Sequence, residues 1–566
     1  MGILLRDASY AHAALVRGMS RPDAYPHPPE AVTHLETHIS HVFLAGELAY
    51  KIKKPLALGF LDFSTLEKRR HFCEEELRIN RRLAPELYLA VVPITGSEQA
   101  PRVEGDGPAI EYAVKMRRFA QDGLLDRVLE RGALSPELID ELAAQVARFH
   151  TEVAQAPAGG RFGSVQSIVE AALQNFDQLA PLLTTPSDCA VLEGLRRWTT
   201  AQSERLAPTF DARQHAGCVR ECHGDLHLGN IVLVDGAVRI FDAIEFNPEL
   251  RWIDLVNEVA FLAMDLAARG RHDLAWRFIN RYLEHTGDYE GVRLLRYYLV
   301  YRAIVRAKVA AIRATQPDTD ACERAALDDK CRRHLVLAQR FALQAHPVLV
   351  IHHGLSGSGK TSCSQTVLET LGAIRIRSDV ERKRIHGLVA AQRTDAAVGE
   401  GLYDAKATRG TYERLAELAR ACLAGGFPTL VDATFLQRGQ REAFRALARA
   451  LAVPFRIASF TAPVEVLRAR VAARQRQGGD ASEAGLVVLE HQLRSIEPLT
   501  PQELATSVCF DTQGIDAQDI DAPGIDAQGI DAQGIDAQDI DVGQIRRHAQ
   551  ALLGAEASRN LNGGKP

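Results

Sequence analysis

A short segment, Gly354 to Ser362, combines glycines, hydroxyl side chains and a lysine in the order GLSGSGKTS. It satisfies the pattern G-x-x-x-x-G-K-[ST], in which backbone N–H groups turn inward on a chain of phosphates. We expect Lys360 to reach the terminal phosphates and the Thr361 hydroxyl to ligate Mg²⁺. The segment therefore predicts a site for ATP and Mg²⁺. Its predicted cofactor-binding residues are Gly354, Leu355, Ser356, Gly357, Ser358, Gly359, Lys360, Thr361 and Ser362.

Two aspartates downstream of this loop could complete its chemistry. Asp432 ends the run TLVD, where its carboxylate would hold the Mg²⁺ shell; a surface aspartate at a strand end is the alternative. Asp379, in RSDVERKR, is predicted to end the strand that follows the P-loop helix, at the edge where an acceptor would bind. We expect it to act as the general base toward an attacking hydroxyl. Its alternative role is to cap a helix that begins at Val380.

An arginine-rich segment, residues 467–476 (LRARVAARQR), follows further along the chain. On a helix, Arg470 and Arg474 share one face because they are four positions apart. Such a face suits a lid whose guanidinium groups close over the transferring phosphate, so both arginines are predicted catalytic residues. A solvated basic face is the alternative.

A second group of polar residues lies in the first half of the chain, in the run HGDLHLGN over 223–230. An aspartate followed five positions later by an asparagine is the spacing of a kinase catalytic loop. Asp225 would orient the acceptor hydroxyl and accept its proton, and Asn230 would hold Mg²⁺. A predicted β-hairpin, Ile231–Phe241, then delivers Asp242 as a second metal carboxylate. A polar turn joined to a strand-end aspartate is the alternative.

A lysine and a glutamate near the amino terminus could serve the same site. Lys51, in LAYKIKKP, is predicted to lie on a strand and to neutralise the α- and β-phosphates; Lys53 shares its face and competes for this role. On the helix that follows, we favour Glu76 over Glu75 as the partner of the lysine. A solvated charged helix is the alternative. The run EYAVKMRRF over 111–119 would link two lobes beside an adenine.

The elements that must position these residues follow from the sequence pattern, which changes along the chain. Short strand-like runs alternate with one charged helix up to about residue 120, and the next two hundred residues are mostly helical. The helical part is interrupted by one strand-rich hairpin. The predicted elements are two strands in His41–Lys53 around a turn at Gly46, a helix over Leu66–Leu83, strands at Ala90–Ile94 and Glu111–Arg117, a helix starting at Ser135, and the hairpin Ile231–Phe241.

Short apolar runs separated by helical sequence fill the last third of the chain, which predicts a parallel, doubly wound sheet. The repeat GIDAQ and its variants then form an acidic, low-complexity insertion over 511–543, to which we assign no function. We therefore predict one domain over 1–345 and a second over 346–566. The predicted strands are Pro347–Ile351, Ala373–Ile376, Pro428–Val431, Phe455–Phe460 and Ser507–Phe510, and helices are expected over Cys363–Leu371 and Gln544–Leu553.

The composition excludes several functional classes. The formal net charge of −5 comes from nine aspartates between Asp511 and Asp541, so the remainder is close to neutral, without the basic stripe of a nucleic-acid-binding protein. The nine cysteines do not form a zinc pattern, since Cys218 and Cys222 lack a second pair of ligands. No leader or membrane-spanning run is visible in the sequence, and reduced thiols fit the cytoplasm.

The segments GLSGSGKTS, RSDVERKR and LVDATF, with the arginine-rich lid, resemble the small P-loop kinases grouped with zeta toxins and polynucleotide kinases. The resemblance covers about 347–510. It implies a P-loop NTPase fold that transfers phosphate to a hydroxyl. In that group the aspartate after the second strand often acts as base, which matches Asp379. The acceptors of the group range from nucleic-acid ends to nucleotide sugars and small metabolites, so the acceptor stays open.

HGDLHLGN and IFDAIEF, within about 30–345, resemble the aminoglycoside phosphotransferase branch of the protein-kinase-like fold. The resemblance implies a bilobal α+β domain ahead of the α/β P-loop domain. A full glycine-rich loop is missing, because only Gly46 stands in the first turn. The branch includes kinases for choline, homoserine and other small alcohols. A cationic acceptor would require an acidic pocket; four carboxylates follow Asp242, but Arg251 lies among them, so they support such a pocket only weakly. They are Glu245, Glu249, Asp254 and Glu258.

Together the two halves predict a kinase with two ATP sites, each transferring the γ-phosphate to a hydroxyl of a small molecule or nucleotide. The alternative treats the first half as a non-catalytic ligand-binding module that regulates the P-loop half. A third interpretation makes the P-loop half an ATP-driven switch. The sequence does not specify the acceptors, the oligomeric state, or any coupling between the two sites.

Overall fold

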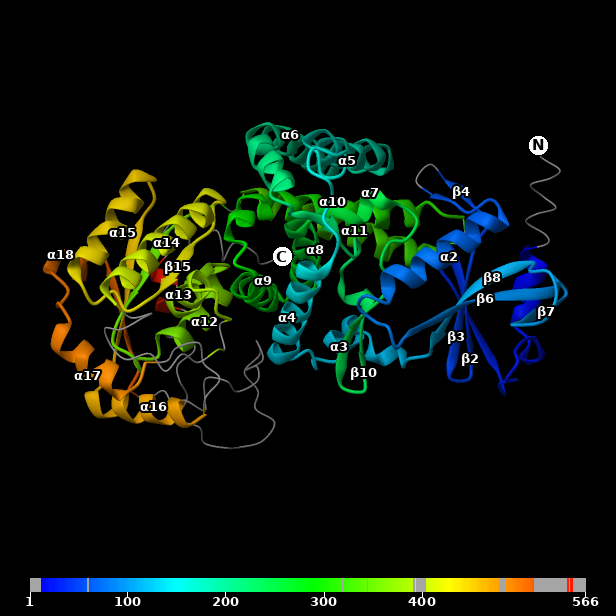
Figure 1. Ribbon diagram of the computed structural model, residues 1–566. Helices are drawn as coiled ribbons and strands as arrows, with labels where there is room; N and C mark the ends of the chain where they lie inside the picture. Colours follow the sequence, from blue (N-terminus) through cyan, green and yellow to red (C-terminus); the bar gives the residue numbers. More distant parts are fainter. Residues whose placement is uncertain are drawn as a thin grey trace. The chain divides into compact units, whose positions relative to one another are not determined.

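A computed structural model gives the fold of the chain, and Figure 1 shows its helices and strands. Packing divides the chain into two compact units. The first unit comprises Met1–Leu134, Arg148–Ser167 and Asp211–Leu262, and the second comprises Ser135–Ala147, Ile168–Phe210 and Ala263–Pro566. The predicted domain boundary near residue 345 stays a prediction. The structure describes residues 12–58, 61–317, 319–343, 345–389, 392, 404–477, 484–513, 547–548 and 550–552.

The first unit contains an antiparallel sheet with the strand order β1-β2-β3-β8-β6-β7. Its central hairpin turns at Gly46, whose φ of +62° suits a residue without a side chain. The two strands predicted around Gly46 are confirmed, and so are the strands predicted near residues 90 and 111. The strands are β1 (Val32–Glu36), β2 (Ser40–Ala45), β3 (Leu48–Lys53), β6 (Tyr88–Ser97), β7 (Ala100–Val103) and β8 (Glu111–Arg117), with a separate pair β4 (Ala57–Leu58) and β5 (Leu61–Asp62).

The two faces of this sheet pack against different helices. Tyr50 and its apolar neighbours cover the helical residues 12–19. Ala49, the adjacent residue on β3, packs on the other face with α2 (Leu66–Asn80). Because side chains alternate along a strand, Lys51 lies on the same face as Ala49, toward α2. The helix predicted over 66–83 is therefore present and ends at Asn80.

Short strands and a tight turn build the rest of the first unit. The hairpin predicted over 231–241 is confirmed, and a single 3-10 turn, η4, leads directly into it. A second antiparallel pair, β9 with β12, holds the chain on either side of that hairpin. The bounds are β9 (Val219–Glu221), η4 (Leu228–Asn230), β10 (Ile231–Val234), β11 (Ala237–Ile240), α7 (Pro248–Arg251), β12 (Trp252–Asp254), and α3 (Leu125–Glu130).

Long helices make up much of the middle of the chain, as the sequence predicts. The predicted start at Ser135 is confirmed, because α4 begins at Pro136, a position where proline costs the helix no hydrogen bond. Among the helices that the structure describes, none has the length and apolar character needed to cross a membrane. The long helices in the middle of the chain are α4 (Pro136–Glu152), α5 (Val165–Leu179), α6 (Pro186–His215), α8 (Leu255–Ala268), α9 (His272–Thr286), α10 (Val292–Ala314) and α11 (Ala321–Leu343).

The second unit contains a five-stranded sheet in the order β14-β15-β13-β16-β17, and every pairing is parallel, as predicted. The strands are β13 (Leu349–His353), β14 (Ile374–Arg377), β15 (Thr429–Asp432), β16 (Phe455–Thr461) and β17 (Ser507–Asp511). The described helices that follow strand β13 along the chain are α12 (Lys360–Leu371), α13 (Ser378–Ile385), α14 (Ala405–Ala424), α15 (Arg438–Ala450), α16 (Val464–Gln477), α17 (Leu486–Ser495) and α18 (Pro501–Leu504).

Strand β14 forms one edge of this sheet, and a side chain of α9 pairs with it. The Asn280 amide donates to the Ala373 carbonyl at 2.8 Å and accepts from the Arg375 N–H at 2.7 Å. It satisfies backbone groups that an edge strand leaves unpaired. The GIDAQ repeat beyond Gln513 lies outside the described residues, and so do five of the ten residues of the helix predicted over 544–553.

Candidate phosphoryl-transfer sites

The phosphate loop of the second unit joins β13 to α12, and its backbone requires glycine. Gly354, Gly357 and Gly359 have φ values of +152°, +83° and +74°. A Cβ at Gly354 would stand 2.6 Å from the Phe460 carbonyl oxygen, closer than any real side chain approaches. The glycines thus keep the loop in a conformation whose N–H groups can face phosphate.

Lys360 opens α12 and folds back over this loop. Its ammonium donates to the carbonyl oxygens of Gly354 at 2.9 Å and Leu355 at 2.7 Å. The pKa of Lys360 is lowered to about 8: burial is the largest cause and the charge of Arg474 adds to it, whereas the charges of Asp432 and Asp379 oppose the shift. The lysine is therefore close to all three of these predicted site residues.

Thr361 and Asp432 meet as a Mg²⁺ site would require. The Thr361 hydroxyl donates to the Asp432 carboxylate at 2.9 Å, and His352 Nδ1 lies 3.2 Å from its other oxygen. Burial disfavours the charged form of Asp432, but the hydrogen bond from His352 and the nearby charge of Arg377 outweigh it. The pKa of Asp432 is accordingly held well below its usual range. A hydroxyl beside an ionised carboxylate is the oxygen donor set that Mg²⁺ prefers.

Asp379 lies one element further along than the sequence indicates. Strand β14 ends at Arg377, which occupies the N-cap position, and α13 begins at Ser378. Asp379 is therefore in the first helical turn and is neither the last strand residue nor the helix cap. Its negative charge still acts on the Lys360 ammonium. Its role as general base stays a prediction.

The two predicted lid arginines both lie on α16 and both bind backbone carbonyls. Arg470 donates to the carbonyl oxygens of Thr512 at 2.6 Å and Gly357 at 3.4 Å. Arg474 donates to the Ala484 carbonyl at 2.9 Å. Arg470 therefore fastens α16 to the phosphate loop itself. Their contact with a transferring phosphate stays a prediction.

A buried ion pair behind the phosphate loop was missed at the sequence level. Arg375 of β14 is 1% exposed; it donates to the Thr361 carbonyl and the Ser364 hydroxyl, each at 3.1 Å. Its countercharge is Glu284 of α9, at 2.7 Å. Burial raises the pKa of Glu284, but Arg375 and neighbouring arginines outweigh this and lower it to about 2. An arginine within the otherwise apolar predicted strand Ala373–Ile376 is the sequence signal that could have revealed the pair.

The catalytic loop of the first unit brings Asp225 and Asn230 into contact. The Asn230 amide donates to the Asp225 carboxylate at 3.0 Å and to its carbonyl oxygen at 3.0 Å. His223 fixes the start of the loop, because its Nδ1 accepts from the Asp225 N–H at 3.2 Å and its Nε2 lies 2.8 Å from the Phe241 carbonyl. Burial lowers the pKa of His223, which favours the neutral ring that these partners require.

A glutamate from α8, Glu258, anchors the same loop from behind. Its carboxylate accepts from the backbone N–H groups of His223 at 3.1 Å and Gly224 at 2.7 Å, and it lies 3.1 Å from His150 Nε2. Burial opposes its charge, but these hydrogen bonds outweigh burial and lower the pKa of Glu258 to about 2. More than thirty residues separate it from the loop, so no local pattern indicates the contact.

Lys51, Glu76 and Asp242 form one ion-pair chain beside the sheet. The Lys51 ammonium lies 2.8 Å from Glu76 and also pairs with Asp242. Lys53, the competing lysine, is fully buried and pairs with Glu76 and Glu245. Burial opposes ionisation of Glu76, but the two ammonium groups outweigh it and lower the pKa of Glu76 to about 2.

Lys51 is thus the lysine that reaches the predicted metal carboxylate, while Lys53 holds the shared glutamate in place. Glu75 instead pairs with Arg78 at the surface. Asp242 follows β11 with a φ of +62°, a left-handed conformation that aspartate tolerates. Its N–H is held by the Tyr88 hydroxyl at 3.1 Å. The structure therefore brings Lys51, Glu76 and Asp242 together.

The four carboxylates after Asp242 already have partners. Glu245 pairs with Lys53, and Asp254 pairs with Arg213 at 2.7 Å. The other two are Glu249, which pairs with Arg161, and Glu258, which holds the catalytic loop. All four carboxylates are therefore engaged by other groups of the chain.

The chain is similar to known proteins over parts of both predicted halves. A family model described as "AAA domain" matches residues 349–499, which contain the phosphate loop, Asp379, Asp432 and the α16 arginines. The chain is 30% identical over 464 residues to the uncharacterized protein Rv2004c of Mycobacterium tuberculosis, covering 81% of this chain and 90% of the relative. The uncharacterized protein Mb2027c of Mycobacterium bovis matches to the same extent. The chain belongs to the family of these mycobacterial proteins.

The shared 464 residues are more than either predicted half contains, so members of this family share parts of both. Among solved structures, an amicoumacin kinase is 12% identical, with 60% of this chain and 96% of that chain covered and a TM-score of 0.38. A gluconokinase from Sinorhizobium meliloti 1021 is 20% identical; the match covers 39% of this chain and 99% of the gluconokinase, with a TM-score of 0.23. Because both TM-scores are low, the fold class is taken from the strand order and pairing of this chain and not from these structures.

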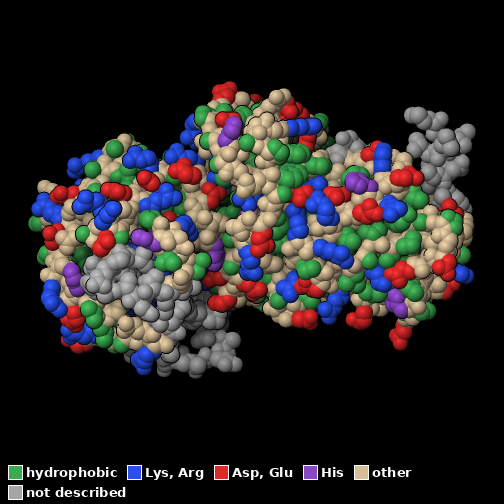
Figure 2. Space-filling view, in the orientation of Figure 1, with side chains coloured by type: hydrophobic (Ala, Val, Ile, Leu, Met, Phe, Trp, Pro, Cys, Tyr) green, Lys and Arg blue, Asp and Glu red, His purple; other side chains and the backbone are tan. Residues whose placement is uncertain are grey.

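The chain thus combines a part built on an antiparallel sheet with a P-loop part built on a parallel sheet. The surface agrees with the neutral composition. Among the described residues on the face in Figure 2, Lys and Arg side chains are interspersed with Asp and Glu rather than gathered into a stripe.

Proposed function

We propose that the chain is a phosphotransferase with two Mg²⁺-ATP sites, each transferring the γ-phosphate to a hydroxyl of a small molecule or nucleotide. The observation that carries the proposal is the first site, where Asn230 holds Asp225 and Lys51 links Glu76 to Asp242. A phosphate-binding loop alone is compatible with simple hydrolysis. A carboxylate oriented beside a metal-binding pair also serves an acceptor hydroxyl.

In the first site, Asp225 would orient the hydroxyl and take its proton, and Asn230 and Asp242 would hold Mg²⁺. Lys51, fixed by Glu76, would neutralise the phosphates. In the second site Lys360 and the loop N–H groups would bind the phosphates, with Mg²⁺ on Thr361 and Asp432. The remaining roles are Asp379 as base and Arg470 and Arg474 as the closing face. Both sites act mainly by positioning and charge neutralisation, since phosphoryl transfer needs little covalent help.

One observation favours the regulatory alternative for the first unit. Strand β2 ends at Ala45 and β3 begins at Leu48, so the connecting turn has only Gly46 and Glu47. A turn of this length is too short to cover the phosphates as a kinase glycine-rich loop does. In the alternative, the first unit binds a ligand without chemistry and regulates the P-loop site.

The test is incubation of the full chain with γ-labelled ATP, Mg²⁺ and a metabolite extract, with mass spectrometry of the labelled products. We expect two groups of products in the wild type. Asp225→Asn should remove one group, and Lys360→Ala the other. Unchanged products with Asp225→Asn would favour the regulatory module. Phosphate release without any labelled acceptor, unaffected by Asp379→Ala, would instead favour an ATP-driven switch.

A further inference from the structure

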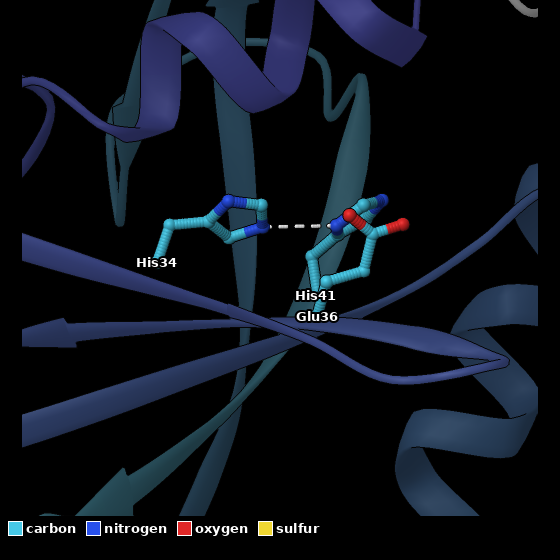
Figure 3. A group of neighbouring side chains, drawn as sticks. All are labelled: His34, Glu36 and His41. Carbon is cyan, nitrogen blue, oxygen red and sulfur yellow. Dashed lines mark hydrogen bonds between the residues drawn. The ribbon is translucent and has the colours of Figure 1, made fainter. Parts of the chain in front are cut away.

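Two histidines and a glutamate gather on the β1–β2 hairpin, away from Lys51 and the other residues of the first proposed ATP site. His34 and Glu36 are two positions apart on β1 and so lie on one face of it, and Glu36 is in register with His41 of β2. Figure 3 shows the His34 ring directed at His41, with the Glu36 carboxylate beside the His41 ring. No motif in the sequence indicates this group, because its members do not follow a metal-binding spacing.

The donor atoms have the spacing of a metal site. His34 Nε2 and His41 Nδ1 are 3.0 Å apart, and one ligand atom from each of the three residues lies within 4.8 Å of the others. A tetrahedral zinc ion with bonds of about 2.0–2.1 Å holds its donors about 3.3 Å apart. The two imidazoles therefore need to separate by only a few tenths of an ångström to admit an ion.

The surroundings of His34 and His41 also indicate a ligand. His41 is 7% exposed, so water has little access to it. His12, on the helical residues 12–19, places its ring 5.2 Å from that of His41. Its Nε2 is buried and has no hydrogen-bond partner among the described residues. Buried polar atoms without a partner are rare in folded proteins, so the region beside His41 has a polar group that the described residues leave unused.

Two contacts compete with an ion: the hydrogen bond between His34 and His41, and the ion pair between Lys54 and Glu36. The Lys54 ammonium lies 2.6 Å from one oxygen of Glu36. A carboxylate has two oxygens, so Glu36 can hold Lys54 with one and offer the other to a metal. The positive charge of Lys54 nevertheless repels a cation bound to Glu36. Removing that charge should therefore strengthen metal binding.

We propose that His34, Glu36 and His41 form a binding site for one divalent transition-metal ion, with zinc as the best match to two imidazoles and a carboxylate. The ion would fasten the edge strand β1 to β2. Since β2 pairs with β3, which carries Lys51, the site would stabilise the sheet of the first unit without touching ATP. Its role is structural and separate from the two Mg²⁺-ATP sites.

The experiment uses the full chain, stripped of metal with a chelator. It is then kept in excess Mg²⁺, so that Mg²⁺ rather than Zn²⁺ fills the metal positions of the two proposed ATP sites. Zn²⁺ is titrated by calorimetry, and Co²⁺ serves as a coloured substitute whose visible absorption reports the coordination geometry. Variants His34→Ala and His41→Ala are compared with His71→Ala, an exposed histidine on α2. His34 is half-buried, so its loss should leave the fold intact, which circular dichroism checks.

We expect the wild type and His71→Ala to bind one equivalent of Zn²⁺ more than His34→Ala or His41→Ala. Loss of a direct ligand should weaken binding at least as much as loss of a supporting group, which costs about 10–100-fold. Lys54→Met should bind Zn²⁺ more tightly than the wild type. Equal binding by the wild type and His34→Ala, or a Co²⁺ spectrum that His34→Ala leaves unchanged, would overturn the proposal.

Discussion

The ion pair between Glu284 and Arg375 makes a quantitative prediction about the phosphate loop. Glu284→Gln keeps the shape of the side chain but leaves Arg375, which is 1% exposed, without its countercharge. The pKa of Glu284 falls from 4.5 to about 2 in the folded chain. Since a tenfold change in proton affinity corresponds to about 1.4 kcal/mol, the charged form gains about 3 kcal/mol. This agrees with the roughly 3–5 kcal/mol lost when one partner of a buried pair is removed.

We therefore expect Glu284→Gln to lower the midpoint of the thermal transition of the second unit by roughly 6–12 °C, at about 2–4 °C per kcal/mol for this size. Circular dichroism on the full chain measures it. The matched control is Glu290→Gln, whose ion pair with Arg293 is largely exposed and worth about 0–1 kcal/mol. Because Arg375 holds the Thr361 carbonyl, ATP affinity at the loop should fall as well.

The same ion pair fixes a pH dependence. A carboxyl whose pKa is depressed on folding stabilises the chain above its unfolded pKa, near 4.5, and loses that contribution as the pH falls toward 2. The difference between wild type and Glu284→Gln should be constant from pH 6 to 8 and shrink below about 4.5. A loss below about 1 kcal/mol at pH 7, or one equal to that of Glu290→Gln, would show that this ion pair does not stabilise the unit.

Three further predictions concern the two sites. Gly354→Ala places a Cβ 2.6 Å from the Phe460 carbonyl, so it should abolish ATP binding at the phosphate loop while the product made by the first site persists in the labelled-ATP assay. Lys360 has a pKa of about 8, and its ammonium loses its proton as the pH rises from 7 to 9, so the ATP affinity of this loop should fall over that range. Calorimetry measures the affinity at each pH. A Lys360→Arg variant that binds ATP should show a flatter dependence of affinity on pH. Glu76→Gln weakens the carboxylate shared by both buried lysines, so it should reduce the rate of the first site by at least about tenfold; a rate within about twofold of wild type would contradict this arrangement.

The motifs could be predicted from the sequence because their geometry is local. The phosphate loop, the Asp225–Asn230 turn and the hairpin before Asp242 each lie within a few residues of chain. Alternation along one strand also placed Lys51 and Lys53 on the same face. It could not decide between them, because that choice depends on Asp242 and Glu245, which approach from nearly two hundred residues away.

The supporting residues could not be predicted, for the same physical reason. Asn280 and Glu284 act on a strand about ninety residues downstream, and Glu258 reaches back more than thirty residues to its loop. Hydrophobic periodicity specifies elements and not their tertiary neighbours. The position of Asp379 was wrong by a residue or two because α13 starts without a side-chain cap at Arg377, leaving no signal for its boundary.

The central claim is that one chain holds two independent ATP sites, and the number of nucleotides bound tests it most directly. Equilibrium dialysis with a non-hydrolysable ATP analogue and Mg²⁺ should give two equivalents for the wild type. Lys360→Ala and Asp242→Asn should each retain one, and the double variant none. A single equivalent in the wild type, lost entirely with Lys360→Ala and unaffected by Asp242→Asn, would contradict the presence of a second site.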